Sequence, residues 1–102
     1  MSVYFVYILQ SRKNDSFYKG STDNLTRRFS EHNLRKEVST KYFAPWDLVW
    51  YTVKESRSEA LLLERKLKNL SVKKTLDFIK RYPIENPWVG GPDVTLPRQS
   101  GC

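Results

Sequence analysis

The spacing of apolar residues predicts three β-strands in this chain. Residues 3–9 read VYFVYIL, with apolar side chains on both alternating faces, which is typical of a central strand covered on both sides. Residues 11–16 are polar and predict a turn, and residues 16–19 predict a second strand that ends at Gly20. The aromatic and β-branched run at 46–53 predicts a third strand.

Three further segments carry helix signals. Capping side chains precede an apolar pattern of helical period over residues 24–32. Ser56 and Glu59 have the spacing of a capping box, which opens a long helix over 57–70. A last helix is predicted over 71–81. The order strand, strand, helix, strand, helix, helix predicts a small α/β sandwich, in which helices pack on a three-stranded sheet.

The length of 102 residues fits one folded domain, which we place at residues 1–82. Four of the five prolines and three of the four glycines lie in residues 83–102, and this composition predicts a C-terminal tail. Neither an internal repeat nor a glycine-rich phosphate loop is visible in the sequence.

Charge and cysteine content narrow the functional classes. Eighteen Lys and Arg residues against eleven Asp and Glu give a net charge of +7, which favours binding to polyanions such as nucleic acid. No stretch is long and apolar enough to span a membrane, and the N-terminus lacks the features of a signal peptide. The single cysteine, Cys102, cannot form an internal disulfide, so we expect a cytoplasmic protein.

The first predicted helix distinguishes between two neighbouring arginines. At about 100° per residue, Leu25, Phe29 and His32 share one narrow stripe. Arg28 lies on the edge of that stripe, whereas Arg27 falls on the opposite side and should face solvent. The structural explanations are a salt bridge for Arg28 and a hydrogen bond to the backbone for His32.

A glutamate interrupts the apolar stripe of the long helix. Glu64 falls inside the stripe that is formed by Ala60, Leu63, Leu67 and Leu70. A buried carboxylate costs several kcal/mol unless it is paired or bound to a cation. The structural explanation is an ion pair, for which Arg28 is a candidate. The functional explanation is a ligand for a hard divalent cation, which prefers carboxylate oxygen.

Two tyrosines complete a set of residues that suits phosphodiester chemistry. Tyr7 alternates with the apolar residues of the first strand, and Tyr18 lies on the second. Taken singly, each is better explained as a core residue whose hydroxyl is hydrogen-bonded. Together with Arg28, His32 and Glu64, however, they supply a base, a proton donor, a cation for developing charge and a metal carboxylate.

These pieces resemble the GIY-YIG nuclease superfamily, and especially its small bacterial members, which are similar to the nuclease module of UvrC. The resemblance spans residues 3–81. It is carried by FVYIL at 5–9, FYKGST at 17–22, NLTRRFSEHN at 24–33 and RSEALLLERKLKNL at 57–70. The order and spacing of these motifs are more specific than any one of them. The resemblance implies a three-stranded antiparallel sheet flanked by helices.

The resemblance also implies roles for individual residues of the first three motifs. Tyr7 matches the general base for the attacking water, and His32 the residue that polarises this tyrosine or serves the leaving group. Tyr18 would hydrogen-bond to the phosphate or the water, and Gly20 would permit close approach of the backbone. Lys19 departs from the motif, and we expect its side chain to point outward and to touch phosphate.

The remaining roles concern charge. Arg28 matches the arginine that stabilises the scissile phosphate. Glu64 matches a single metal-binding glutamate, which implies one Mg²⁺ or Mn²⁺ ion. We also expect Arg27 and Lys66 to contact the substrate.

A late asparagine is common near the metal site of this family. Asn69 and Asn86 are both candidates for that role, and the sequence does not choose between them.

The resemblance therefore implies a metal-dependent endonuclease that hydrolyses DNA phosphodiester bonds in repair or recombination. The alternative is a non-catalytic module that binds nucleic acid, for which the charge of +7 and the aromatic content suffice. This alternative has weight because the ordinary pKa of a tyrosine is about 10, so Tyr7 needs help to act as a base near neutrality. A third hypothesis is an interaction domain whose Pro- and Gly-rich tail docks on a partner.

Overall fold

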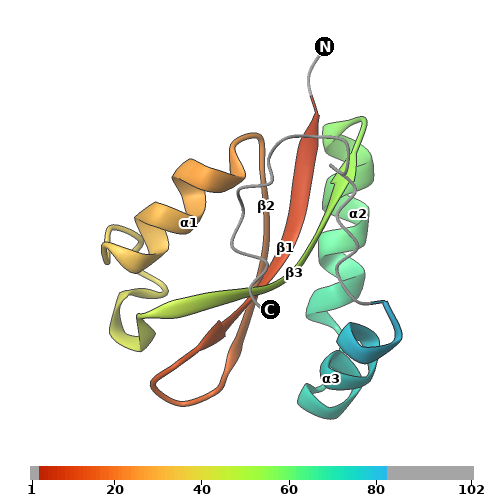
Figure 1. Cartoon of the computed structure of the whole chain (residues 1–102). Coiled ribbons are helices and arrows are strands. Elements are labelled where there is room, and N and C mark those ends of the chain that lie inside the picture. Colours follow the sequence, from red (N-terminus) through yellow and green to blue (C-terminus); the bar gives the residue numbers. More distant parts are fainter. Residues whose placement is uncertain (1–2, 83–102) are drawn as a thin grey trace.

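A three-stranded antiparallel sheet forms the centre of the molecule (Figure 1). The computed structural model describes residues 3–82. Strands β1 (Tyr4–Ser11), β2 (Phe17–Thr22) and β3 (Trp46–Lys54) are arranged in the order β2-β1-β3. The predicted central position of the first strand is confirmed, because β1 pairs with both other strands.

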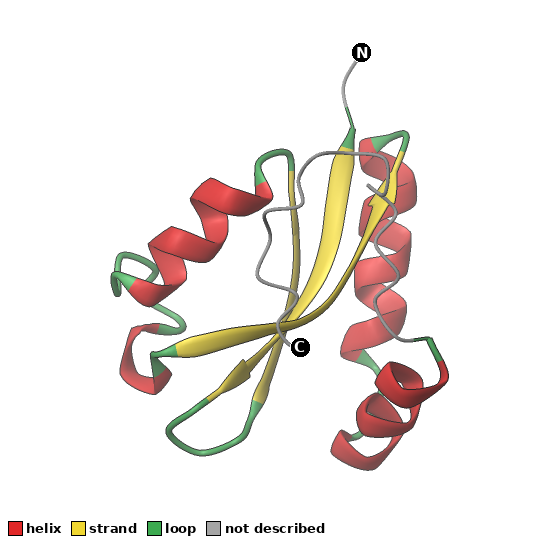
Figure 2. Cartoon of the chain, viewed as in Figure 1, coloured by secondary structure: helices red, strands yellow, loops and turns green. Residues whose placement is uncertain are grey.

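Helices cover both faces of this sheet (Figure 2). Helix α1 (Leu25–Asn33) lies on one face, and α2 (Arg57–Lys68) and α3 (Val72–Arg81) lie on the other. A short 3-10 helix, η1 (Lys41–Phe43), precedes β3. The predicted class, an α/β fold with the element order β-β-α-β-α-α, is confirmed.

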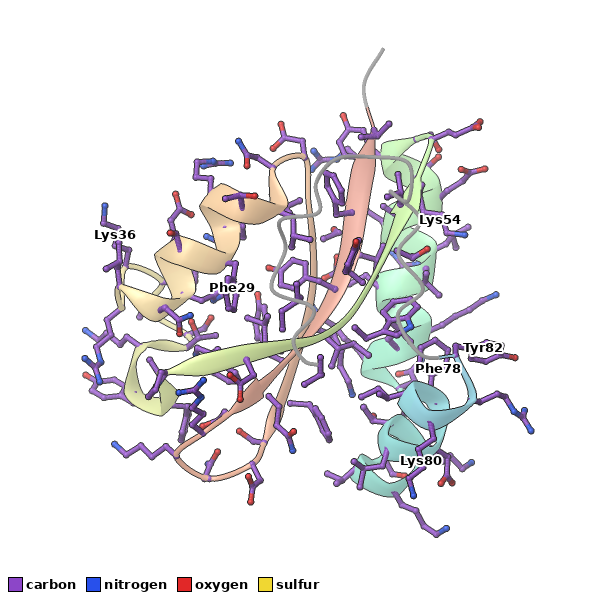
Figure 3. All side chains as sticks on the ribbon, viewed as in Figure 1. Phe29, Lys36, Lys54, Phe78, Lys80 and Tyr82 are labelled. Carbon is purple, nitrogen blue, oxygen red and sulfur yellow. The ribbon has the colours of Figure 1, made fainter. Side chains whose placement is uncertain are left out.

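Each face of the sheet has its own apolar cluster, because neighbouring residues of β1 point to opposite sides. On the α1 face, Phe29 turns from its helix toward the sheet (Figure 3). The buried members of this cluster are Phe5, Tyr7, Leu9, Leu25, Ala44, Trp46 and Tyr51. The buried members on the other face are Val6, Ile8, Trp50, Ala60 and Leu67. The burial of residues 5–9 of β1 on both faces explains their unbroken apolar sequence.

The helix starts are fixed by the capping side chains that the sequence predicts. The side chains of Asn24, Ser56 and Ser71 each accept a hydrogen bond from the backbone N–H three residues later. The end of α1 is fixed to the start of β3, because the Asn33 amide both accepts from the Trp46 N–H and donates to the Trp46 carbonyl. This pair of bonds holds α1 over the sheet.

The prediction that the second strand ends at Gly20 is wrong. Strand β2 continues to Thr22, and Gly20 is buried within it, opposite Tyr7 of β1. A Cβ atom on Gly20 would lie 2.7 Å from Oη and 2.9 Å from Cζ of Tyr7. Glycine is therefore required here by the closely packed ring of Tyr7, and not by a chain reversal.

Some predictions concern residues that the structure does not describe. The predicted tail over 83–102, with Asn86 and Cys102, lies outside the described residues. Within residues 3–82, none of the helices has the length and apolar character that crossing a bilayer requires.

Candidate active site

The side chains of Tyr7, His32 and Thr40 form a buried hydrogen-bonded chain on the α1 face. Tyr7 Oη lies 3.0 Å from His32 Nε2, and His32 Nδ1 lies 2.8 Å from Thr40 Oγ1. The side chain of His32 is completely buried. Both ring nitrogens therefore have a partner, which removes the cost of burying an unpaired polar group.

Burial shifts the pKa values of this chain in opposite directions. Burial, assisted by the neighbouring charge of Arg28, lowers the pKa of His32 from 6.5 to about 4. Burial, together with the nearby Tyr18, raises the pKa of Tyr7 above its ordinary value, although Arg28 opposes that shift. At neutral pH both groups are thus uncharged. Tyr7 then keeps its proton, and His32 carries one on either nitrogen.

The second tyrosine lies beside this chain of hydrogen bonds. The rings of Tyr18 and His32 are 4.8 Å apart between centroids, and the rings of Tyr18 and Tyr7 are 6.3 Å apart. Gly20 lies against the same group, because the absence of a side chain at position 20 leaves room for the hydroxyl end of Tyr7. The structure thus brings Tyr7, Tyr18, Gly20 and His32 together, as the sequence motifs predict.

Arg28 and Arg27 differ in solvent exposure, as the helical spacing predicts. The Arg27 side chain is 55% exposed and pairs with Asp23 and Glu31 of its own helix region. The Arg28 side chain is 26% exposed and lies close enough to Tyr7 to lower its pKa. Arg28 therefore faces the buried chain of hydrogen bonds, whereas Arg27 faces solvent.

The suggested ion pair between Arg28 and Glu64 is wrong. Arg28 binds two other carboxylates instead. Its Nη1 is 3.0 Å from Glu31, one turn along α1, and its Nη2 is 2.5 Å from Glu37, which lies beyond the helix. The chain reverses after α1 at Arg35, whose φ of 63° is left-handed, and this reversal returns Glu37 to the helix.

Glu64 lies at the edge of β2, on the other side of the sheet. Its Oε1 accepts a hydrogen bond of 2.6 Å from the Ser21 hydroxyl, and its Oε2 is 2.8 Å from Lys68 Nζ. The side chain is only 16% exposed, which confirms its predicted place in the core-facing stripe of the helix. Its negative charge still reaches Tyr7, whose pKa it helps to raise after burial and Tyr18.

The three remaining candidates do not join the buried chain. Lys19 pairs with Ile8 in the sheet register, so its side chain lies on the α2 face, away from Tyr7. It is half-buried, and burial lowers its pKa. Lys66 and Asn69 are exposed on α2 and at its C-terminal cap.

A divalent metal ion has one candidate protein ligand here. Within the described part of the chain, no group of three or more His, Cys, Asp and Glu side chains is placed to hold a metal ion. A single carboxylate still suits Mg²⁺, which keeps several waters and often takes only one or two carboxylates. The Glu64 carboxylate already pairs with one cation, Lys68, which a metal ion would have to replace. The residues present therefore fit a single, largely hydrated ion.

Four residues at the site were not found from the sequence: Ser21, Glu37, Thr40 and Lys68. Lys68 had a usable signal, because it is four residues after Glu64 and so adjacent to it on the helix surface. Thr40 and Glu37 had none, since the irregular connection after α1 has no period from which a contact can be inferred.

Comparison with known proteins agrees with this fold. The GIY-YIG catalytic domain matches residues 3–77. A UPF0213 protein of Staphylococcus haemolyticus is 35% identical over 81 residues, which cover 78% of this chain and 98% of that protein. A UPF0213 protein of Syntrophus aciditrophicus is 35% identical over 85 residues, covering 81% and 97%.

A solved structure has the same architecture. The solution NMR structure of a UPF0213 protein from Bacillus halodurans matches with a TM-score of 0.52 and 30% identity, covering 78% of this chain and 84% of that one. The motif order, the sheet topology and the domain match thus agree with one another. The chain belongs to the GIY-YIG superfamily of nucleases.

Proposed function

We propose that the protein is a metal-dependent endonuclease that hydrolyses DNA phosphodiester bonds, and that it serves repair or recombination in the cytoplasm. The observation that carries this proposal is the buried hydrogen bond between Tyr7 and His32 next to Arg28. This arrangement holds a proton acceptor and an arginine that can bind phosphate close together on the α1 face of the sheet. We assign the activity to residues 1–82.

The raised pKa of Tyr7 defines how it can act on water. A free tyrosinate is not available near neutral pH, so Tyr7 must lose its own proton as it receives one from the attacking water. His32 Nε2 is the acceptor within reach. This requires that His32 Nδ1–H donate to Thr40 Oγ1, which fixes the tautomer that leaves Nε2 free to accept.

The charged groups have complementary parts in this proposal. Arg28 binds the scissile phosphate and stabilises the charge that develops on it. Glu64 would hold one Mg²⁺ or Mn²⁺ ion, which would supply Lewis-acid chemistry at the phosphate. Gly20 permits close approach of the backbone, and the exposed cations Arg27 and Lys66 contact neighbouring phosphates. Lys19 is the weakest candidate of this group because it lies on the α2 face.

A second candidate function is binding of nucleic acid without cleavage. It is favoured by the raised pKa of Tyr7 and by the fact that Arg28 and Glu64 both already have oppositely charged partners. The net charge of +7 supports either function.

Nicking of supercoiled plasmid DNA with Mg²⁺ distinguishes the two functions. We expect the wild type to nick, and Glu64→Ala and Arg28→Ala to lose about 10²–10³-fold in rate, as for the loss of one group that stabilises developing charge. Glu59→Ala and Arg65→Ala are matched controls, because both residues are exposed on α2 and change the charge equally. Equal trace activity in the wild type and Glu64→Ala would contradict the nuclease proposal.

A further inference from the structure

Glu37 is the least expected member of the site. It follows the helix that carries Arg28, and the left-handed turn at Arg35 brings it back against that helix. The backbone bonds from Arg35 N–H to the His32 carbonyl and from Lys36 N–H to the Glu31 carbonyl fix the turn. While the neighbouring Lys36 projects away from the molecule (Figure 3), the Glu37 side chain is only 27% exposed.

Several contacts hold the Glu37 carboxylate against Arg28. Oε1 of Glu37 is 2.5 Å from Arg28 Nη2, and Oε2 accepts a hydrogen bond from the Ser39 hydroxyl. The Glu37 carbonyl accepts a bond from the Thr40 N–H, which keeps the loop in register. The bond with Arg28 is also the largest cause that lowers the pKa of Glu37, so the carboxylate is charged at neutral pH.

Arg28 therefore already binds anions when no ligand is present. A guanidinium offers five N–H donors in a planar fork, which matches carboxylates and phosphates alike. Glu31 and Glu37 each bind one of the two terminal nitrogens, Nη1 and Nη2, so both nitrogens at the open end of the fork already have an anionic partner. A phosphate that binds both terminal nitrogens of Arg28 therefore competes with these carboxylates for the same end of the guanidinium. Glu31 belongs to the same helix as Arg28, whereas Glu37 lies in the connection between α1 and η1.

We propose that Glu37 is an internal substitute for the substrate phosphate, which a ligand must displace to reach Arg28. A single phosphate makes one contact and competes poorly with a tethered carboxylate. A nucleic-acid strand also contacts the other cations of the surface, so its summed binding free energy can drive the exchange. Glu37 thus selects extended polyanions over inorganic phosphate and mononucleotides. This inference rests on the proposed role of Arg28 as the phosphate-binding residue.

The first test measures binding of a fluorescent DNA duplex by anisotropy in EDTA, so that it needs no cleavage. We expect Glu37→Gln to bind about fivefold more tightly than the wild type, the scale of one partly exposed ion pair. Glu55→Gln, at an exposed position before α2, changes the net charge equally and should change binding less than twofold. The effect of Glu37→Gln should disappear in an Arg28→Ala background.

The second test observes Arg28 directly through the NMR signal of its Nε–Hε group. In the wild type, the duplex should shift this signal, whereas inorganic phosphate at an equal concentration of phosphate groups should not. In Glu37→Gln, inorganic phosphate should shift it as well. Circular dichroism verifies that the variant is folded, and the wild-type titration remains decisive if it is not.

Three results would overturn the inference. They are equal effects of Glu37→Gln and Glu55→Gln, persistence of the Glu37→Gln effect without Arg28, and an equal response of wild-type Arg28 to inorganic phosphate and to DNA. The failure of the nuclease proposal is a separate result. If the wild type does not nick DNA but Glu37→Gln still binds more tightly through Arg28, the nuclease proposal fails and the role of Glu37 stands.

Discussion

The two sides of the candidate site are built differently. On the α1 face, Tyr7, His32 and Thr40 are buried, uncharged at neutral pH and joined by hydrogen bonds. At the edge of β2, Glu64 and Lys68 form a charged pair whose lysine is 53% exposed. The groups that handle protons are thus fixed within the core. Glu64, which is proposed to bind metal, is instead paired with Lys68, a partly exposed lysine that another cation can replace.

This difference has an energetic basis. Breaking a buried hydrogen bond is costly, because the donor and the acceptor then stay buried with neither water nor another group to bond with. A partly exposed ion pair is worth little and exchanges easily, because water and salt replace either partner. The fold can therefore keep a fixed geometry for proton transfer and still exchange ions at the adjoining edge.

The largest expected effect is a loss of stability in acid that comes from His32. Its folded-state pKa of about 4 lies below the ordinary 6.5, so between these values the unfolded chain binds more protons. The stability from keeping His32 neutral is complete above about pH 6.5 and is lost as the pH falls toward 4, up to about 3 kcal/mol. Urea unfolding measured across this range checks the prediction.

The matched control for this profile is His32→Gln, which cannot titrate. Its unfolding free energy should be nearly constant from pH 6.5 to 4.5, since Glu31 and Glu37, with lowered pKa values, contribute their losses below about 4.5. An equal slope in the variant would show that another group titrates, and the contrast between the two sides would lose its basis.

A smaller effect is expected from filling the space at Gly20. Gly20→Ala should destabilise the protein by about 1–3 kcal/mol, because the new Cβ would overlap the hydroxyl end of Tyr7. At an open strand position the same change would instead stabilise by up to about 1 kcal/mol through lower chain entropy. The sign of the change in unfolding free energy, measured with urea, therefore reports the close packing.

Removing the Tyr7 hydroxyl should weaken this effect. In a Tyr7→Phe background, the atom 2.7 Å from the new Cβ is gone, so Gly20→Ala should cost less than in the wild type. If the cost is unchanged, the clash comes from the ring carbon Cζ, 2.9 Å from the new Cβ and retained in phenylalanine, and the Tyr7 hydroxyl is not what requires glycine at this position.

The smallest effect on stability is expected at the β2 edge. Lys68→Ala should change the unfolding free energy by no more than about 0.5 kcal/mol, because the pair is partly exposed. It should nevertheless increase the affinity for Mn²⁺ about threefold, measured by titration calorimetry without DNA, because Glu64 no longer has a competing cation. Lys80→Ala, an exposed lysine of α3, is the charge-matched control. Equal Mn²⁺ affinities in the two variants would contradict competition by Lys68.

Local pattern was sufficient to predict the elements and the orientation of their side chains. The helical period separated Arg28 from Arg27 and placed Glu64 in an inward stripe, and the structure has both arrangements. These predictions succeeded because the direction of a side chain on a regular helix depends only on its position along that helix.

The partners of those side chains could not be predicted in the same way. Which carboxylate reaches Arg28 depends on the turn at Arg35, and which hydroxyl reaches Glu64 depends on the register of β2. Both are tertiary features. The strand end at Gly20 was wrong for a related reason, since a glycine that interrupts a strand by propensity can be retained by a ring packed across from it.

The close packing of Tyr7 against Gly20 also limits how this site can diversify. The two positions share one volume, so a larger residue at 20 is compatible only with a smaller one at 7, and a smaller residue at 7 gives up the hydroxyl that reaches His32. Strands β1 and β2 therefore have to be exchanged together wherever the residue at position 7 or 20 changes in size. The hairpin is the smallest unit that keeps Tyr7 and Gly20 together, and His32 of α1 must accompany it for the Tyr7 hydroxyl to keep its partner.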